Sequence, residues 1–193
     1  MASPVPRRVT VDEFLAGLAG DSERLELIDG VVTAMVGGTA AAHLIAGNIF
    51  GNLFNRLRGG PCVPFGDGML VMVDEHSAFA PDVAVVCTPV GAQEQYLTDP
   101  TVIVEVLSPS TESFDRGFKW LQYQTIPSLR HYLLVAQDRH LVETFSRGRD
   151  DRWIYAAFRD DPTAEIRLDA VGVSLTLAEI YEGVTIASAD ATP

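Results

Sequence analysis

The sequence predicts one domain over residues 1–193 with an α/β (α+β) fold, in which helices flank a central mixed β-sheet. Residues 101–107 and 131–136 are almost continuously apolar, which is typical of strands covered on both faces. Residues 39–58 carry apolar side chains at every fourth position, which indicates a helix that packs on a sheet. The order of helix, hairpin, helix, strands, helix and strands implies one α/β domain with a mixed sheet.

The N-terminal half begins with a helix and a hairpin. The run Thr-Val-Asp-Glu at 10–13 is a capping box, which predicts a short helix that stops near Gly20. Asp29 and Gly30 separate two β-like runs, 25–28 and 31–36, and this dipeptide favours the positive φ angles of a tight hairpin turn.

The long helix over 39–58 has a clear apolar stripe and a clear end. The stripe recurs with the i, i+4 spacing of one helix face, at Ile45, Ile49, Leu53 and Leu57. Gly59-Gly60-Pro61 stops the helix. Strands are then expected at 69–73, 83–87 and 101–107.

The C-terminal half continues with a helix over 114–126 that ends before Pro127, with a buried face supplied by Phe114, Phe118 and Leu121. A buried strand follows over 131–136, with His131 expected at a sheet edge. Two antiparallel C-terminal strands (141–145 and 153–158), a closing helix (177–181) and a frayed tail (about 186–193) complete the expected elements.

The composition excludes several classes of protein. Hydrophobic residues make up 47% of the chain, and no apolar run approaches the length of about 20 residues that spans a bilayer. The N-terminal run lacks the hydrophobic stretch of a secretory signal, so the expected location is cytoplasmic, without a membrane partner. Cys62 and Cys87 are expected to be reduced and structural, because two cysteines with no CxxC spacing form no disulfide framework or zinc site.

The charge balance bears on nucleic-acid binding. The net charge is −12, from 26 acidic and 14 basic residues. An acidic surface repels phosphate backbones at long range, which argues against a nonspecific nucleic-acid coat protein. Thirteen of the basic residues are arginine, and the remaining one is Lys119.

Two carboxylates interrupt strands that otherwise read as buried. Asp82 directly precedes the apolar run 83–86, and Glu105 lies inside the run 101–107. A buried carboxylate is costly unless it is paired, hydrogen-bonded or bound to a metal. A structural explanation remains open for each acid. Asp82 could accept hydrogen bonds from backbone N–H groups at a strand end, and Glu105 could pair with an arginine.

The helix that follows places more polar groups near Glu105. Asp115, Lys119 and Tyr123 are spaced i, i+4, i+8 and share one helix face. The short run Ser-Pro-Ser-Thr at 108–111 links this helix to the strand of Glu105, so its first turns lie near the strand's C-terminal end, where α/β proteins commonly bind ligands. A solvated Asp115–Lys119 ion pair is the structural alternative.

These residue types suit metal-assisted hydrolysis of a phosphodiester. Two carboxylates, Asp82 and Glu105, hold Mg²⁺ or Mn²⁺, which lowers the pKa of a bound water and neutralises charge on the phosphate. Lys119 orients or deprotonates that water. Glu26 is a candidate third acid, and a solvated acid on an edge strand is the alternative for it.

At this point the motifs resemble a known family. Pro81-Asp82, the run Glu-Val-Leu-Ser-Pro-Ser-Thr at 105–111, Asp115-Arg116-Gly117 and Lys119 are similar to the PD-(D/E)XK nuclease superfamily. Within it, they resemble the Uma-type family of restriction-endonuclease-like proteins. The similarity extends over most of the chain, from the hairpin at 26–30 through His43 to the final helix.

The resemblance implies a restriction-endonuclease-like core and divalent-metal hydrolysis of DNA. It assigns metal ligation to Asp82 and Glu105, the catalytic lysine role to Lys119, and an accessory role to Glu26. The superfamily's lysine, two residues after the strand acid, would fall at Leu107. Lys119 takes its place in this family's pattern, and its reach into the site is a geometric expectation.

Further candidates are accessory. His43, Asp115 and Tyr123 are candidate contributors to the site, and for His43 a packed or partly exposed histidine is the alternative. The turn at 37–40, Gly-Gly-Thr-Ala, lies at the N-terminus of the long helix, where it is able to cradle a phosphate, although it is not a P-loop.

The expected function is a Mg²⁺- or Mn²⁺-dependent endonuclease acting on DNA, as a homodimer because cutting a duplex needs two active sites. Two alternatives stay open. The first is a catalytically inactive nucleic-acid-binding or regulatory module with the same fold. The second is a glycoside hydrolase that uses the carboxylate pair Asp82 and Glu105, which would require sugar-binding aromatic residues; Trp120 and Tyr123 are the nearby candidates.

Overall fold

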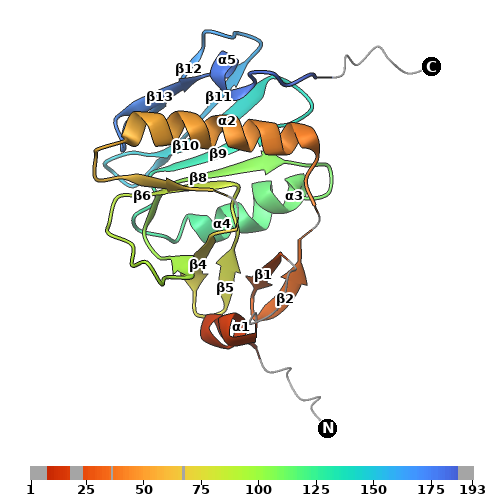
Figure 1. The fold of residues 1–193 in the computed structure, drawn as a ribbon, viewed down its shortest axis with the longest axis vertical. Coiled ribbons are helices and arrows are strands. Elements are labelled where there is room, and N and C mark those ends of the chain that lie inside the picture. Colours follow the sequence, from red (N-terminus) through yellow and green to blue (C-terminus); the bar gives the residue numbers. More distant parts are fainter. Residues whose placement is uncertain (1–7, 18–23, 36, 67, 187–193) are drawn as a thin grey trace, which may run out of the picture.

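The computed structural model of the chain describes residues 8–17, 24–35, 37–66 and 68–186. Its centre is a six-stranded mixed sheet (Figure 1). From one edge to the other, the strands are β11 (Trp153–Arg159), β10 (Leu141–Arg147), β9 (His131–Ala136), β8 (Pro100–Leu107), β6 (Val83–Val86) and β3 (Val63–Phe65). Strands β8 and β9 pair in parallel, and the other neighbours are antiparallel. The predicted mixed sheet is therefore confirmed.

The central strands are buried on both faces, as their apolar runs predict. Every residue of β9 is buried, and so is all of β8 except Thr101. The parallel register runs from the pair Val102 and His131 to the pair Leu107 and Ala136, so both strands end at the same edge of the sheet.

Helix α2 (Ala40–Leu57) covers one face of this sheet. Its stripe of Ile45, Ile49, Leu53 and Leu57 is buried against the sheet, as predicted. The side chain of Thr39 accepts a hydrogen bond from the N–H of Ala42 and caps the helix. A hairpin of β12 (Glu165–Leu168) and β13 (Val173–Thr176) and the short helix α5 (Leu177–Ile180) pack into the same core.

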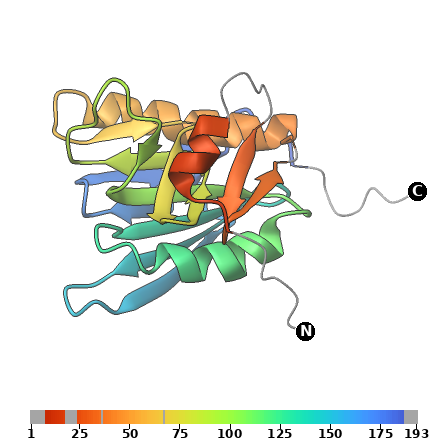
Figure 2. The same ribbon diagram turned by 90° about the horizontal axis from the view of Figure 1, so that it is seen from below.

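The opposite face carries a helical segment formed by α3 (Glu112–Phe114), a π-helical turn η1 (Asp115–Lys119) and α4 (Trp120–Tyr123). Figure 2 shows α2 above the strands and this segment below them. A helix was expected over 114–126, and the observed one begins and ends a little earlier. The expected burial of Leu121 is wrong, because its exposed fraction is 65%. The wider π-helical turn rotates the residues after it, and Tyr123 is fully buried.

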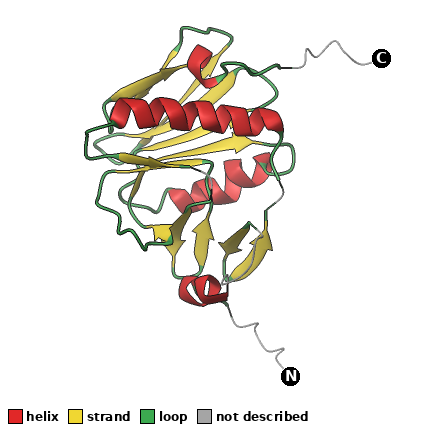
Figure 3. Cartoon of the chain, viewed as in Figure 1, coloured by secondary structure: helices red, strands yellow, loops and turns green. Residues whose placement is uncertain are grey.

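A second, five-stranded sheet lies beside the first (Figure 3). In order, its strands are β2 (Val31–Ala34), β1 (Leu25–Ile28), β5 (Ser77–Phe79), β4 (Leu70–Asp74) and β7 (Tyr96–Leu97), and helix α1 (Val11–Gly17) packs into the core of this sheet. The hairpin of β1 and β2 and the capping box of α1 are confirmed. The turn residues have φ angles of 50° at Asp29 and 79° at Gly30.

Some expectations fall outside the described residues: the stop of the first helix near Gly20, the end of the second hairpin strand at Val36, and the tail at 186–193 apart from Ile186. No helix in the described ranges is long and apolar enough to cross a membrane.

The expectation that the two cysteines are reduced is wrong, because Cys62 and Cys87 form a disulfide. Val63 at the start of β3 pairs with Val86 at the end of β6, which places the two cysteines opposite each other at the next position of the antiparallel pair. This register brings together residues 25 positions apart in the sequence. No spacing motif in the sequence reveals that contact.

The expectation that His131 marks a sheet edge is also wrong. His131 begins β9, between β8 and β10, and its exposed fraction is 5%. Its Nε2 accepts from the N–H of Ala170, so its Nδ1 carries the proton and donates to Oγ of Ser146. Burial lowers the pKa of His131, although Asp169 acts in the opposite direction.

This buried histidine predicts a pH dependence of stability. Because the pKa of His131 is lower in the folded chain than its unfolded value of about 6.5, the unfolded chain binds more protons between the two values. The free energy of unfolding therefore rises with pH in that window, by at most about 1.4 kcal/mol per pH unit, and this contribution is flat above it.

Urea unfolding of the wild type and of His131→Gln between pH 5 and pH 7.5 checks this prediction. The difference between their pH slopes isolates the histidine, because the carboxylates titrate in both proteins. Equal slopes in the two proteins would contradict the assignment.

Candidate active site

The site is built where β6 begins and β8 ends. Val83 pairs with Val104, so Asp82 and Glu105 stand directly opposite each other at the next position of this antiparallel pair. Directly opposite residues point to the same face of a sheet, with Cβ atoms about 4.5–5.5 Å apart. The strand register therefore brings together the two acids that the sequence singled out.

Each of the two acids has one oxygen held by the protein. Oδ2 of Asp82 accepts from the N–H of Val106 at 2.6 Å, as the structural explanation for Asp82 expects. Oε1 of Glu105 accepts from Nζ of Lys119 at 3.2 Å and from the hydroxyl of Tyr123 at 3.0 Å. The other oxygen of each acid takes part in no hydrogen bond within the described part of the chain.

Lys119 points into the protein, and its exposed fraction is only 4%. Its Nζ lies 2.9 Å from Glu26, 3.2 Å from Glu105 and 3.5 Å from Asp115. The solvated ion pair considered for Asp115 and Lys119 is thus replaced by a buried cluster. The expected reach of Lys119 to Glu105 is present in the structure.

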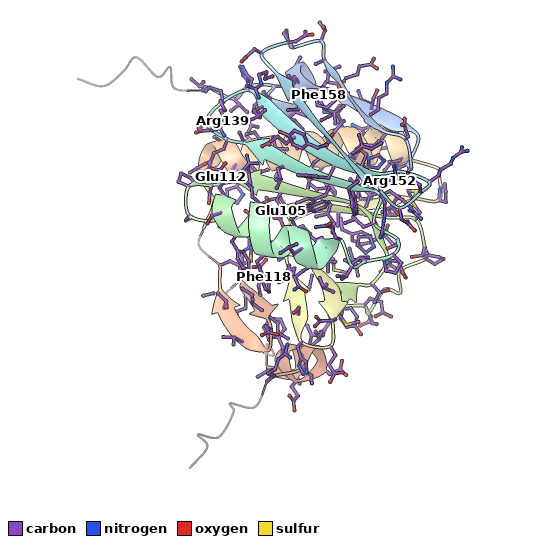
Figure 4. The ribbon with its side chains drawn as sticks, turned by 180° about the vertical axis from the view of Figure 1, so that it is seen from behind. Glu105, Glu112, Phe118, Arg139, Arg152 and Phe158 are labelled. Atoms are coloured by element: carbon purple, nitrogen blue, oxygen red, sulfur yellow. A yellow bond between two sulfur atoms is a disulfide. The ribbon has the colours of Figure 1, made fainter. Side chains whose placement is uncertain are left out.

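The π-helical turn η1 supplies both Asp115 and Lys119, and contacts of its backbone and of Arg116 hold it in place. The hydroxyl of Tyr132 donates to the backbone carbonyl of Asp115 at 3.0 Å. Arg116 forms ion pairs with Glu112 in the preceding turn and with Glu143 on β10. Figure 4 shows this helix, with Glu112 and Phe118 labelled, in front of the strand that carries Glu105. The turn is therefore anchored directly to the central sheet.

Glu26 reaches the cluster from β1 of the second sheet. One of its oxygens accepts from the N–H of Ala80 at 2.9 Å and also contacts Lys119. Glu26 is buried, so the alternative of a solvated acid on an edge strand does not hold. The cluster therefore joins the two sheets and the helical segment.

Burial and mutual repulsion shape the charges of the cluster. Burial is the main cause that raises the pKa of Asp82, Glu105 and Asp115, most strongly for Glu105. Burial alone would lower the pKa of Lys119, but Glu105, Glu26 and Asp115 outweigh it and raise that pKa. The lysine therefore carries its positive charge.

The cluster opens into a cavity of about 260 Å³ between the N-terminus of α2 and the loop after β8. Asp82, Glu105, Asp115 and Lys119 line it, and His43 lines it from an exposed position on α2. Glu26 and Tyr123 do not line the cavity; they contact residues that do. Of the accessory candidates, His43 and Asp115 therefore line the cavity, whereas Glu26 and Tyr123 contact the residues that line it.

Sequence reasoning missed several residues of the cavity wall, among them the polar Arg24 and Gln137. Gln137 follows the end of β9 directly, so the rule that ligands bind at the C-terminal ends of strands was the available signal. Arg24 precedes β1 in a stretch that carries no motif. Its charge lowers the pKa of Asp82, against the dominant effect of burial.

The carboxylates fit a hard divalent cation. Asp82 and Glu105 are adjacent, both line the cavity, and each retains an oxygen that forms no hydrogen bond with any described residue. Across the described ranges, no group of three His, Cys, Asp or Glu side chains forms a ready metal site. Mg²⁺ binds through one or two carboxylates together with several waters, so two protein ligands meet its requirement.

The cavity wall does not fit a sugar. No Phe, Tyr or Trp among the described residues lines it. Tyr123 is fully buried behind Glu105, and Trp120 stacks on Tyr132 and Phe145. The glycoside-hydrolase interpretation required aromatic residues at the site, and both candidates lie in the core.

The mixed sheet, the flanking helices and the cluster of acids with a lysine define the class as restriction-endonuclease-like. The Uma2 family model, described as "Putative restriction endonuclease", matches residues 11–178. The chain belongs to this family, and the sequence-based resemblance is confirmed.

Two relatives from Synechocystis sp. carry the name of uncharacterised proteins. One is 31% identical over 185 residues, which covers 95% of this chain and 96% of the relative. The other is 29% identical over 150 residues, covering 76% and 85%. The crystal structure of a "putative nuclease belonging to DUF820" from Anabaena variabilis has a TM-score of 0.72 at 17% identity, covering 90% of this chain and 97% of that one. That structure shares the fold.

The buried lysine predicts a large effect on stability. Lys119→Met removes the cation that faces three carboxylates and leaves their charges unpaired in the interior. We expect the free energy of unfolding to fall by about 3–5 kcal/mol, as for other broken buried ion pairs. Urea unfolding at pH 7 measures it.

Arg152→Met is the matched control. Arg152 pairs with Asp150, its side chain is 84% exposed, and its loss is expected to cost less than about 1 kcal/mol. A similarly small change for Lys119→Met would show that the cluster does not depend on the lysine.

Proposed function

We propose that this chain is a Mg²⁺-dependent endonuclease that hydrolyses DNA phosphodiester bonds, with Mn²⁺ as a substitute metal. One observation carries the proposal: the Lys119 ammonium lies 3.2 Å from Glu105, in a cavity that Asp82 also lines. The family description as a restriction endonuclease supports it, and so does a structural neighbour named as a nuclease.

Asp82 and Glu105 are the residues that would hold the metal, through the oxygens that form no hydrogen bond within the described ranges. When bound, Mg²⁺ supplies a water of lowered pKa and neutralises charge that develops on the phosphate. The N–H of Val106 fixes the carboxylate of Asp82, and the hydroxyl of Tyr123 fixes that of Glu105. These two contacts orient the acids toward the cavity.

Lys119 is the cation of the site. As a protonated amine it places a positive charge beside the attacking water and the phosphate oxygens, and it stabilises the negative charge that develops there. Glu26 and Asp115 hold its Nζ from two sides, so the ammonium needs no rearrangement before the reaction. Tyr123 acts through Glu105 and is a positioning residue.

The proposal extends to assembly and location. A duplex has two strands to cut, so we infer that two copies act on one DNA as a homodimer. DNA as substrate favours the cytoplasm.

A binding or regulatory module without catalysis is the second candidate, and the net charge of −12 favours it. That charge repels DNA at long range. The two candidates share the fold and differ in whether the carboxylates support turnover.

Cleavage of plasmid DNA in Mg²⁺ tests the proposal. Asp82→Asn and Glu105→Gln keep the shapes of the side chains but remove the negative charges that hold the metal. Lys119→Met removes the ammonium, and circular dichroism verifies that each variant is folded at the assay temperature. We expect each change to lower the cleavage rate at least about 100-fold.

Asp138→Asn, an exposed acid that does not line the cavity, is the control and keeps the wild-type rate. Wild-type protein that cleaves neither DNA strand in Mg²⁺ or Mn²⁺ supports the binding module instead. Cleavage that survives all three site changes would contradict the assigned residues.

A further inference from the structure

Gln137 contributes a polar group to the cavity that the proposed mechanism does not use. It follows β9 directly and lines the cavity together with Asp82, Glu105 and Lys119. Its Nε2 is buried and has no hydrogen-bond partner within the described part of the chain. Burying an amide donor without a partner costs free energy, so a ligand that supplies a hydrogen-bond acceptor at this position would be favourable.

The other end of the amide is already engaged by Thr39. Thr39 Oγ1 accepts from the N–H of Ala42, so its own proton is available for an acceptor, and it donates to Oε1 of Gln137. The amide oxygen is therefore turned toward the start of α2. The Nε2 donor is consequently the part of the Gln137 side chain that is left for a ligand.

Gln137 and the acids approach the cavity from opposite faces of the sheet. Glu105 pairs with Leu134, which packs in the core beneath the helix of Lys119. Leu133 and Val135 pack toward α2, and Gln137 continues their alternation. Gln137 lies three residues beyond the level of Glu105, which is about 10 Å along the strand. The cavity thus extends across the end of the sheet, from the acids to the amide.

This separation exceeds the size of one phosphate group. A group held at the acids and a group held at Gln137 are therefore neighbouring groups of one extended ligand. The acids attract a metal and repel free anions, whereas the amide is a neutral donor suited to an anionic oxygen. A nucleic-acid backbone provides such oxygens at regular spacing.

We propose that Nε2 of Gln137 donates a hydrogen bond to a nonbridging oxygen of the phosphate next to the one being cleaved. This inference rests on the proposed endonuclease function and adds a substrate-positioning residue to it. Gln137 sets the path of the backbone across the end of the sheet, and Thr39 holds the amide in the orientation that does so.

The variant Gln137→Glu tests the donor while keeping the acceptor for Thr39. A carboxylate at this position repels the phosphate, so KM for a short DNA substrate is expected to rise about tenfold or more, with kcat within about twofold. Gln93→Glu, at an exposed position outside the cavity, is the matched control for the added charge and leaves KM unchanged.

A chemically altered substrate locates the contact. A neutral methylphosphonate in place of the neighbouring phosphate weakens the acceptor, so it raises KM for the wild type. With Gln137→Ala, the same substitution adds little, because the interaction is already absent. Independent, additive effects of the two changes would overturn the inference, as would an unchanged KM in Gln137→Glu.

Failure of this inference is distinguishable from failure of the proposed function. Wild-type protein that cleaves DNA while the Gln137 variants behave as wild type rejects only the role of Gln137. Wild-type protein that cleaves no DNA rejects the endonuclease function and removes the basis of this contact.

Discussion

The structure depends on one buried ammonium that balances several buried carboxylates. Lys119 contacts Glu26, Glu105 and Asp115, and all four residues are at most 6% exposed. A buried charge without a partner is strongly unfavourable, so these groups are compatible with a folded core only as a set. Even so, the acids outnumber the lysine, and that excess of negative charge is what makes the pocket suitable for a cation.

The fold brings this set together from distant parts of the chain. Glu26 comes from the second sheet, Glu105 from the centre of the first, and Lys119 from the helical segment between them. The π-helical turn is where the helix departs from regular α geometry, and it carries both Asp115 and Lys119. Such turns occur frequently at functional sites, where they re-aim side chains at the expense of regular helical hydrogen bonding.

The sequence predicted the central strands, the long helix, and the meeting of Asp82, Glu105 and Lys119. It succeeded because burial constrains residue type: an acid inside an apolar strand demands a partner, and the single lysine lies one short loop and two helical turns away. Its failures involve contacts that local patterns do not encode. The Cys62–Cys87 disulfide depends on the register of two strands. The exposure of Leu121 depends on an irregular helical turn. The position of Gln137 at the cavity depends on two parallel strands that end together.

Thermal unfolding with added Mn²⁺ tests the central claim, that Asp82 and Glu105 form a working cation site. At a concentration 100 times its Kd, a ligand that binds only the folded chain stabilises it by about 2.7 kcal/mol, which raises Tm by about 5–10 °C for a chain of this length. The account predicts this rise for the wild type and its loss in the double variant Asp82→Asn/Glu105→Gln. An unchanged wild-type Tm, or an equal rise in both proteins, would contradict it.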